Sequence, residues 1–222
     1  MFKHRLIPEI VDLQSRVSTK NTQTGRVYVI DGEDYEFPSI TTVLGRQPKD
    51  WLFEWKRRVG EETANKIARQ ATTKGTKVHN ALEEIVHNEN VNYDHLMPNV
   101  VMSIKGAKNV LDTYLNEVWA SECALFSKYL RVAGRVDLVG LWDNVPSIID
   151  FKTSRRHKTL SDIENYLIQE TAYSIMFEEI TTISIPQLVT VMMVDGDPKP
   201  LIFVQKRKDW EKITLEIIKK YR

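Results

Sequence analysis

Apolar residues recur with two different periods along this chain, and segments of the two kinds are interleaved. A spacing of three to four residues predicts helices over 40–44, 50–69, 76–87, 100–118, 161–180 and 209–221. Short runs rich in β-branched and aromatic residues predict strands within 119–132 and over 132–142, 147–153, 187–194 and 201–205. Helices therefore precede, interrupt and follow a run of strands. This order predicts an α/β domain with a mixed central β-sheet flanked by helices.

Polar and turn-forming residues mark the boundaries of these elements. Two short apolar runs, 26–30 and 35–37, flank a stretch rich in Asp and Gly, which predicts a hairpin. Ser39 is expected to cap the helix that follows. Breaks are expected at 72–75, 88–98 and 144–147. Residues 1–24 mix acids and bases and predict an N-terminal arm, either mobile or carrying a short helix, ahead of a single domain over 25–222.

Composition narrows the class of protein. The net charge of the 222 residues is +1, so any nucleic-acid binding must come from local basic patches. The one cysteine, Cys123, excludes an internal disulfide and a multi-cysteine Fe–S cluster, and we expect it to be a small core residue. No apolar run approaches the length of a membrane span, and residues 1–20 lack the apolar core of a signal peptide. We therefore expect an intracellular protein that binds no membrane.

Two carboxylates and an ammonium form the most informative pattern. Asp150 and Lys152 follow an apolar run and lie two residues apart, so on a strand they face the same side while Phe151 faces the other. A hairpin between 132–142 and 147–153 brings Asp137 close to Asp150. Such a set is costly to bury unless a divalent cation lies between the carboxylates, and hard cations such as Mg²⁺ or Mn²⁺ prefer carboxylate oxygens. The alternative is a partly exposed, salt-bridged hairpin.

A second pattern places His79 and Glu83 four residues apart on one face of a helix. His79 is either a structural histidine at the rim of the core or an imidazole ligand of the metal. In the second case, Glu83 would orient the ring or bind through water. An imidazole ligand would favour Mn²⁺ over Mg²⁺. The other histidines, His4, His87, His95 and His157, are expected at the surface.

Further candidates lie after the Asp150 strand. Gln169 and Tyr173 share a helix face and can bond a phosphate or a metal-bound water, and Tyr173 can also stack on a base; a plain amphipathic helix face is the alternative. Hydroxyls and cations that suit backbone phosphates follow Lys152 directly, although a solvated basic loop is equally compatible. They are Thr153, Ser154, Arg155, Arg156, His157 and Lys158. Trp51, Trp55, Arg57 and Arg58 form either an aromatic and basic platform or, for the tryptophans, part of the core.

Taken in order, these patterns resemble the PD-(D/E)XK nuclease superfamily, and specifically its RecB-like branch. The motifs of that branch are Gly-x-x-x-His-x-x-x-Glu, Gly-x-x-Asp, Asp-x-Lys and Gln-x-x-x-Tyr. Here they correspond to Gly75/His79/Glu83, Gly134/Asp137, Asp150/Lys152 and Gln169/Tyr173. Over roughly residues 36–205 the chain is similar to the family of the mitochondrial genome maintenance exonuclease and its phage relatives, through the stretches 37–44, 120–122 and 150–154.

The resemblance implies a restriction-endonuclease-like core and a role for each matching residue. His79, Asp137 and Asp150 would bind Mg²⁺ or Mn²⁺, and the main-chain carbonyl of Phe151 would be a further ligand. Lys152 would be catalytic, and Gln169 and Tyr173 would support the substrate phosphate; Glu83 is a further catalytic candidate. The substrate contacts are expected from Thr153, Ser154, Arg155, Arg156, Lys158 and Glu122.

The hypothesis from sequence is therefore a metal-dependent DNA exonuclease acting on single strands or free ends. It would serve replication, recombination, repair or phage genome metabolism. No mitochondrial targeting segment, helicase region or cysteine cluster is evident, which favours a stand-alone nuclease in the cytoplasm of a bacterial or phage-infected cell. Two alternatives remain: a structure-specific endonuclease of the same fold, and a non-catalytic nucleic-acid-binding recombination protein.

Overall fold

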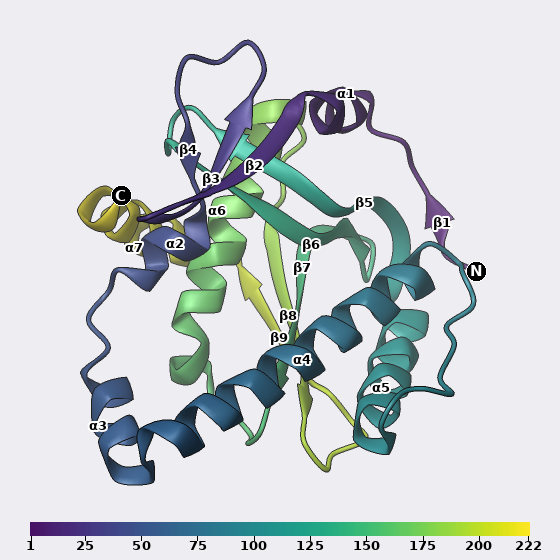
Figure 1. Ribbon diagram of the computed structural model, residues 1–222. Helices are drawn as coiled ribbons and strands as arrows, with labels where there is room; N and C mark the ends of the chain where they lie inside the picture. The colour runs from purple at the N-terminus through teal and green to yellow at the C-terminus, as the bar shows by residue number, and fades with distance from the viewer.

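The computed structural model describes residues 1–222, except for the side chain of Trp51 (Figure 1). The strands are β1 (Lys3–His4), β2 (Val17–Thr22), β3 (Gly25–Ile30), β4 (Phe37–Pro38), β5 (Leu115–Ser127), β6 (Val132–Trp142), β7 (Val145–Ser154), β8 (Gln187–Val194) and β9 (Leu201–Lys206). The helices are α1 (Pro8–Arg16), α2 (Ile40–Gly45), α3 (Asp50–Val59), α4 (Glu61–Val86), α5 (Pro98–Tyr114), α6 (Glu164–Thr181) and α7 (Arg207–Tyr221), with a 3₁₀ turn at Leu160–Ile163. The predicted α/β class with a mixed sheet is confirmed.

The central sheet has six strands in the order β1-β5-β6-β7-β8-β9. Strands β5, β6 and β7 form an antiparallel meander, and β7 then pairs in parallel with β8 through the crossover helix α6. A parallel pair needs such a crossover, because its two strands must start at the same edge. Strand β9 returns antiparallel to β8, and the short β1 is parallel to β5.

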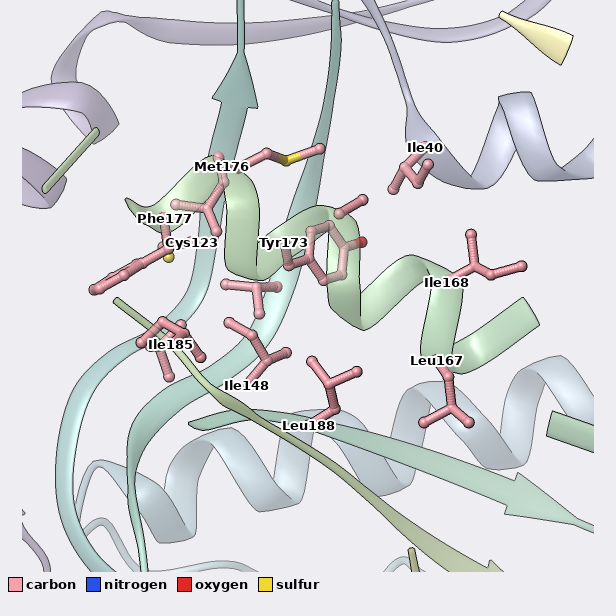
Figure 2. Packing of buried hydrophobic residues seen from close by; sticks show 14 of the residues in the cluster. Ile40, Cys123, Ile148, Leu167, Ile168, Tyr173, Met176, Phe177, Ile185 and Leu188 are labelled. Atoms are coloured by element: carbon pink, nitrogen blue, oxygen red, sulfur yellow. The ribbon is translucent and has the colours of Figure 1, made fainter. Parts of the chain in front are cut away.

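Helices cover both faces of this sheet with separate apolar cores. On one face, α6 packs its buried residues over Ile148 and Leu188 of the central strands, as Figure 2 shows. On the other face, α4 and α5 pack over Ile149, Phe151 and Val191. Neighbouring residues of β7 thus point into opposite cores, as the two-residue period of a strand requires. In Figure 1, the long helix α4 runs diagonally across the molecule beside α5.

The N-terminal residues form regular structure that joins the domain. The short helix that the sequence allows lies at Pro8–Arg16, and Ile7, Ile10 and Leu13 are buried. Strand β2, which was not predicted, pairs with β3 in a three-stranded sheet, while the predicted hairpin of β3 and β4 is confirmed. No described helix has both the length and the apolar character needed to cross a membrane.

Several predicted boundaries are wrong. The break expected at 72–75 lies within the 26-residue helix α4, and the helix predicted over 50–69 ends instead at Val59. Gly60 sets this boundary, since its φ of 85° is left-handed and most other residues avoid it. The helix predicted to reach 118 ends at Tyr114, because Leu115 already pairs with Trp142 in the sheet.

Turns and caps also differ in detail from the prediction. The turn between β6 and β7 lies at Asp143 and Asn144, both with positive φ, rather than at 144–147. Two such residues make the tight loop whose twist matches an antiparallel pair. Ser39 precedes α2, but its hydroxyl bonds the Thr41 hydroxyl at 2.8 Å and caps no backbone amide. Cys123 is buried in the core, as expected.

Candidate active site

Strands β6 and β7 bring the two predicted carboxylates together. Leu138 pairs with Ile149 in an antiparallel register, so Asp137 and Asp150 lie at adjacent positions of neighbouring strands. The backbone N–H of Phe151 donates a hydrogen bond to Oδ2 of Asp137 at 2.8 Å. This bond fixes the Asp137 carboxylate beside the Asp150 strand. The hairpin geometry predicted from the sequence is confirmed.

Helix α4 delivers His79 to the same place from across the sheet. Nδ1 of His79 lies 3.5 Å from Oδ2 of Asp137 and 3.9 Å from Oε1 of Glu122. Glu122 belongs to β5 and lies opposite Asp137, because Ser121 pairs with Leu138 and Cys123 pairs with Val136; its φ of 46° is left-handed. From this position the Glu122 carboxylate approaches the His79 ring. Glu122, expected to contact nucleic acid, therefore lies in the ligand group.

The donor set fits a divalent cation. One ligand atom from each of His79, Glu122 and Asp137 lies within 4.8 Å of the others, the one such group of three in the part of the chain that the structure describes. Two atoms bound to one ion at about 2.1 Å are separated by about 3 to 4 Å. The 3.5 and 3.9 Å separations agree with that range. Two carboxylates with one imidazole suit Mn²⁺ and Mg²⁺.

Asp150 and Lys152 form a more deeply buried pair beside this group. The Asp150 side chain is 1% exposed and is in ion-pair contact with the Lys152 ammonium. Apart from Lys152, neither Asp150 oxygen has a hydrogen-bond partner among the described residues. A buried carboxylate with lone pairs free is costly. A cation next to it would supply the missing partner, so Asp150 also fits the ligand role that the resemblance implies.

The electrostatics of the site also favour a bound cation. Burial, reinforced by the neighbouring Asp150 charge, raises the pKa of Asp137 to about 7. Burial lowers the pKa of His79, but Glu122 and Asp137 outweigh this effect and raise it overall. Burial likewise opposes the charge on Lys152, yet Asp150 and Asp137 raise its pKa, so the ammonium stays charged. The carboxylates of the site lie close together, so their negative charges repel one another. Without a bound cation, protons on Asp137 and His79 neutralise part of this charge.

Gln169 and Tyr173 of α6 bond one another, Nε2 of Gln169 donating to the Tyr173 hydroxyl at 3.0 Å. The Tyr173 ring is buried in the core beside Ile40 (Figure 2), so it offers no face for a base to stack on in this structure. Gly134 makes room for it, because a Cβ there would lie 2.6 Å from the ring. The Gly-x-x-Asp motif therefore also serves the packing of α6 on β6.

The remaining predicted residues lie around the site at different depths. Glu83 borders the same cavity as His79, but the carboxylates that approach the ring belong to Asp137 and Glu122. The Phe151 side chain is buried under α4, with its ring edge-on to His79 at 6.2 Å between centroids. Trp55 is half-buried, Arg57 and Arg58 are exposed, and the Trp51 side chain lies outside the described part of the structure.

The loop after β7 is anchored in three places. The Ser154 hydroxyl donates to the carbonyl of Arg156 at 2.7 Å, and Arg156 lies 3.8 Å from Asp162. Lys158 donates to the Tyr166 hydroxyl at 3.0 Å. Thr153 lies against Gly75 of α4 and is half-buried, whereas Arg155 is exposed. Arg155 and Arg156 are therefore the predicted phosphate contacts that are exposed to solvent.

A cavity of about 400 Å³ opens over the ligand group, lined by residues of α4, by Glu122 and by Arg135 and Asp137. A larger cavity of about 700 Å³ lies between β9 and α7, where no metal-ligating group is found among the described residues. The smaller cavity is therefore the candidate site, because the metal-ligating side chains line it. It has the size of cavities that bind single small molecules, roughly 300 to 1,000 Å³.

Two neighbours of the site were missed from the sequence. Tyr166 places its ring 5.1 Å from the Lys152 ammonium and 4.9 Å from that of Lys158. Glu170 is completely buried on α6 and accepts a hydrogen bond from the Thr190 hydroxyl at 2.5 Å. Tyr166 lies three residues before Gln169 and so shares its helix face, which is a usable sequence signal. A glutamate in a helix gives no comparable signal, because glutamate is usually exposed.

A mixed sheet with two carboxylates and a lysine at its centre is the arrangement of a metal-dependent nuclease. The family model of the PD-(D/E)XK nuclease superfamily matches residues 42–219, and the chain belongs to this superfamily. Among solved structures, the chain is similar to one described as "Crystal structure of SSO0001", at 13% sequence identity and a TM-score of 0.39. That match covers 77% of this chain and 71% of the other. No curated protein matches the chain.

Proposed function

We propose that the protein is a Mg²⁺- or Mn²⁺-dependent deoxyribonuclease that acts as an exonuclease on single-stranded DNA or free DNA ends. The observation that carries this proposal is the convergence of His79, Glu122 and Asp137 beside the buried pair of Asp150 and Lys152. Membership of the nuclease superfamily supports the reaction class.

Each side chain has a distinct part in this proposal. His79, Asp137 and Asp150 hold the ion, and Glu122 joins them, with the Phe151 carbonyl as a further ligand. The ion, when bound, lowers the pKa of a water and neutralises the leaving oxygen. The ammonium of Lys152 stabilises the charge that develops on the phosphate. Gln169 offers a donor to a phosphate oxygen, held in place by Tyr173.

Substrate contacts are assigned to the loop after β7. Arg155, Arg156 and Lys158, with the hydroxyls of Thr153 and Ser154, would follow the phosphate backbone. The cavity of about 400 Å³ over the ligand group has the size of a pocket for one small molecule, such as a nucleotide. The resemblance to phage relatives supports a role in replication, recombination or repair in the cytoplasm of a bacterial or phage-infected cell.

The test is a cleavage assay with Mn²⁺ or Mg²⁺ on linear single strands labelled at either end, linear duplex and closed circles of each. Metal-dependent loss of the linear substrates, with the circles intact, is the expected result. Cleaved circles would show an endonuclease. Binding without cleavage in either metal would contradict the enzyme assignment and favour a non-catalytic DNA-binding protein.

A further inference from the structure

Glu170 is a buried acid that the proposed chemistry does not use. It follows Gln169 on α6, it is 0% exposed, and Oε1 accepts the hydrogen bond from Thr190. Oε2 is also buried and has no hydrogen-bond partner among the described residues. Leaving such an oxygen unpaired is unfavourable, because it loses its hydrogen bonds to water and gains none in the protein. A second partner for Oε2 would remove this cost.

The sheet places Glu170 next to the catalytic pair. Thr190 pairs with Asp150 in the parallel ladder of β7 and β8, and both residues face α6, as Ile148 and Leu188 do one position earlier on that face. The hydrogen bond to Thr190 therefore fixes the Glu170 carboxyl over the strand position of Asp150. Glu170 also contributes to the field that keeps Lys152 charged.

Lys152 and a divalent cation compete for Asp150. In the described structure, the ammonium pairs with an Asp150 oxygen. A cation held by Asp150 repels the ammonium and takes the lone pairs it used. A buried ammonium that loses its partner is strongly destabilised, so Lys152 then needs another acceptor on the same side of the sheet. Oε2 of Glu170 is such an acceptor, and a carboxyl keeps acceptor capacity in either protonation state.

We propose that Glu170 is a positioning residue that receives the Lys152 ammonium when Asp150 is engaged by a cation. Lys152 thereby leaves Asp150 free for the ion without leaving the site. This inference rests on the proposed function, because it takes Asp150 as a ligand and Lys152 as the catalytic lysine. It adds a residue that none of the four motifs contains.

The test is a double-mutant cycle read out by Mn²⁺ binding in a calorimeter. Glu170→Met keeps a side chain of similar length and removes the acceptor. We expect it to weaken Mn²⁺ binding about tenfold and to lower kcat more than it changes KM for an oligonucleotide. In a Lys152→Met background, the same substitution should change the Mn²⁺ affinity less than twofold, because no ammonium then needs the acceptor.

Two outcomes would overturn the proposal. One is wild-type Mn²⁺ affinity and kcat in Glu170→Met. The other is an equal loss of affinity in both backgrounds, which would make Glu170 merely structural. If Glu170→Met does not fold, Glu170→Gln, with one acceptor oxygen instead of two, should show a smaller loss that again disappears without Lys152. An unchanged Gln variant, or a loss that persists without Lys152, would then overturn the idea.

Thr171→Val is the matched control, since it removes a buried hydroxyl of α6 that donates to the Leu167 carbonyl and leaves Glu170 and its partner Thr190 in place. It should change Mn²⁺ affinity far less than Glu170→Met does. A failure of the proposed function itself looks different, because the wild-type protein would then neither bind Mn²⁺ nor cleave DNA.

Discussion

The candidate site has two halves that differ in their access to solvent. The half formed by His79, Glu122 and Asp137 borders the cavity, with side chains 27%, 21% and 13% exposed. The half formed by Asp150 and Glu170 is closed under α6, with exposures of 1% and 0%. Lys152 lies between them. The first half can exchange a ligand with water, whereas the second can change only by rearranging its own hydrogen bonds and ion pairs.

This difference separates two kinds of mutational effect. Ligands at the cavity should affect metal affinity with little change in folding, because solvent can replace a lost partner. Substitutions in the closed half should affect both metal affinity and folding stability, because the group that loses its partner there stays buried and cannot bond water instead. Substitutions in the two halves test this division.

Lys152→Ala should lower kcat on the order of 10²- to 10³-fold, as expected when charge stabilisation at the phosphate is lost. Its Mn²⁺ affinity should be retained or increased, because Asp150 no longer shares its oxygens with the ammonium. Single-turnover cleavage measures the rate of the chemical step, and calorimetry on the same preparation measures the Mn²⁺ affinity. Cleavage by Lys152→Ala at the wild-type rate would disprove the mechanism.

Glu122→Gln should weaken Mn²⁺ binding about 10- to 100-fold, whereas Glu83→Gln should change it only slightly. Glu122 lies 3.9 Å from His79 and belongs to the ligand group, and Glu83 only borders the cavity. The magnitude is that of losing a partner at a metal site. The increase in melting temperature on adding Mn²⁺ measures it without substrate. If Glu83→Gln lost more Mn²⁺ affinity than Glu122→Gln, Glu83 rather than Glu122 would be the metal ligand.

These residues also show what the sequence could and could not predict. Strands β6 and β7 and their hairpin follow from local apolar runs, and so does the approach of Asp137 to Asp150. Glu122 joins the ligand group through the register of β5 on β6, which places it opposite Asp137 and which no local pattern encodes. Its place in the ligand group therefore could not be predicted from spacing.

The course of α4 was mispredicted for a related reason. Polar residues at 72–75 suggested a break, but the packing of Val78 and Leu82 on the sheet holds the helix together. Tertiary contacts outweigh weak local helix propensity. Similarly, the burial of Glu170 depends on Thr190, which lies 20 residues away in the sequence. Long-range partners of this kind decide which polar residues are buried.

Mn²⁺ affinity should rise with pH up to about 7 and then level off. In the metal-free protein, the pKa of Asp137 is raised to about 7, and that of His79 is raised too. The ion must displace these protons, so its apparent affinity should change by up to about tenfold per pH unit for each proton released, and by up to about a hundredfold where both groups are protonated. Calorimetry between pH 5.5 and 8.5 measures this change.

Stability without metal should show the opposite trend. Folded Asp137 holds a proton that the unfolded chain, with a carboxyl pKa near 4, releases, so its contribution to the free energy of unfolding falls as pH rises from about 4 to about 7. Asp137→Asn should remove this part of the pH dependence in thermal melts. An unchanged profile in that variant would place the titration elsewhere.

The smallest effect is expected outside both halves, at Arg155. This exposed side chain follows the site in the chain and would contact a phosphate rather than the reacting atoms. Arg155→Ala should raise KM for a single-stranded oligonucleotide about two- to fivefold with kcat unchanged. It should also reduce the slope of log affinity against log salt by about 0.7, the value for one phosphate contact to a single strand. Lys219→Ala, which removes an exposed cation on α7, is the matched control and should alter neither quantity. A fall in kcat instead would mean that Arg155 belongs with Lys152 in the chemistry, and the boundary between binding and reacting groups would then have to include the loop after β7.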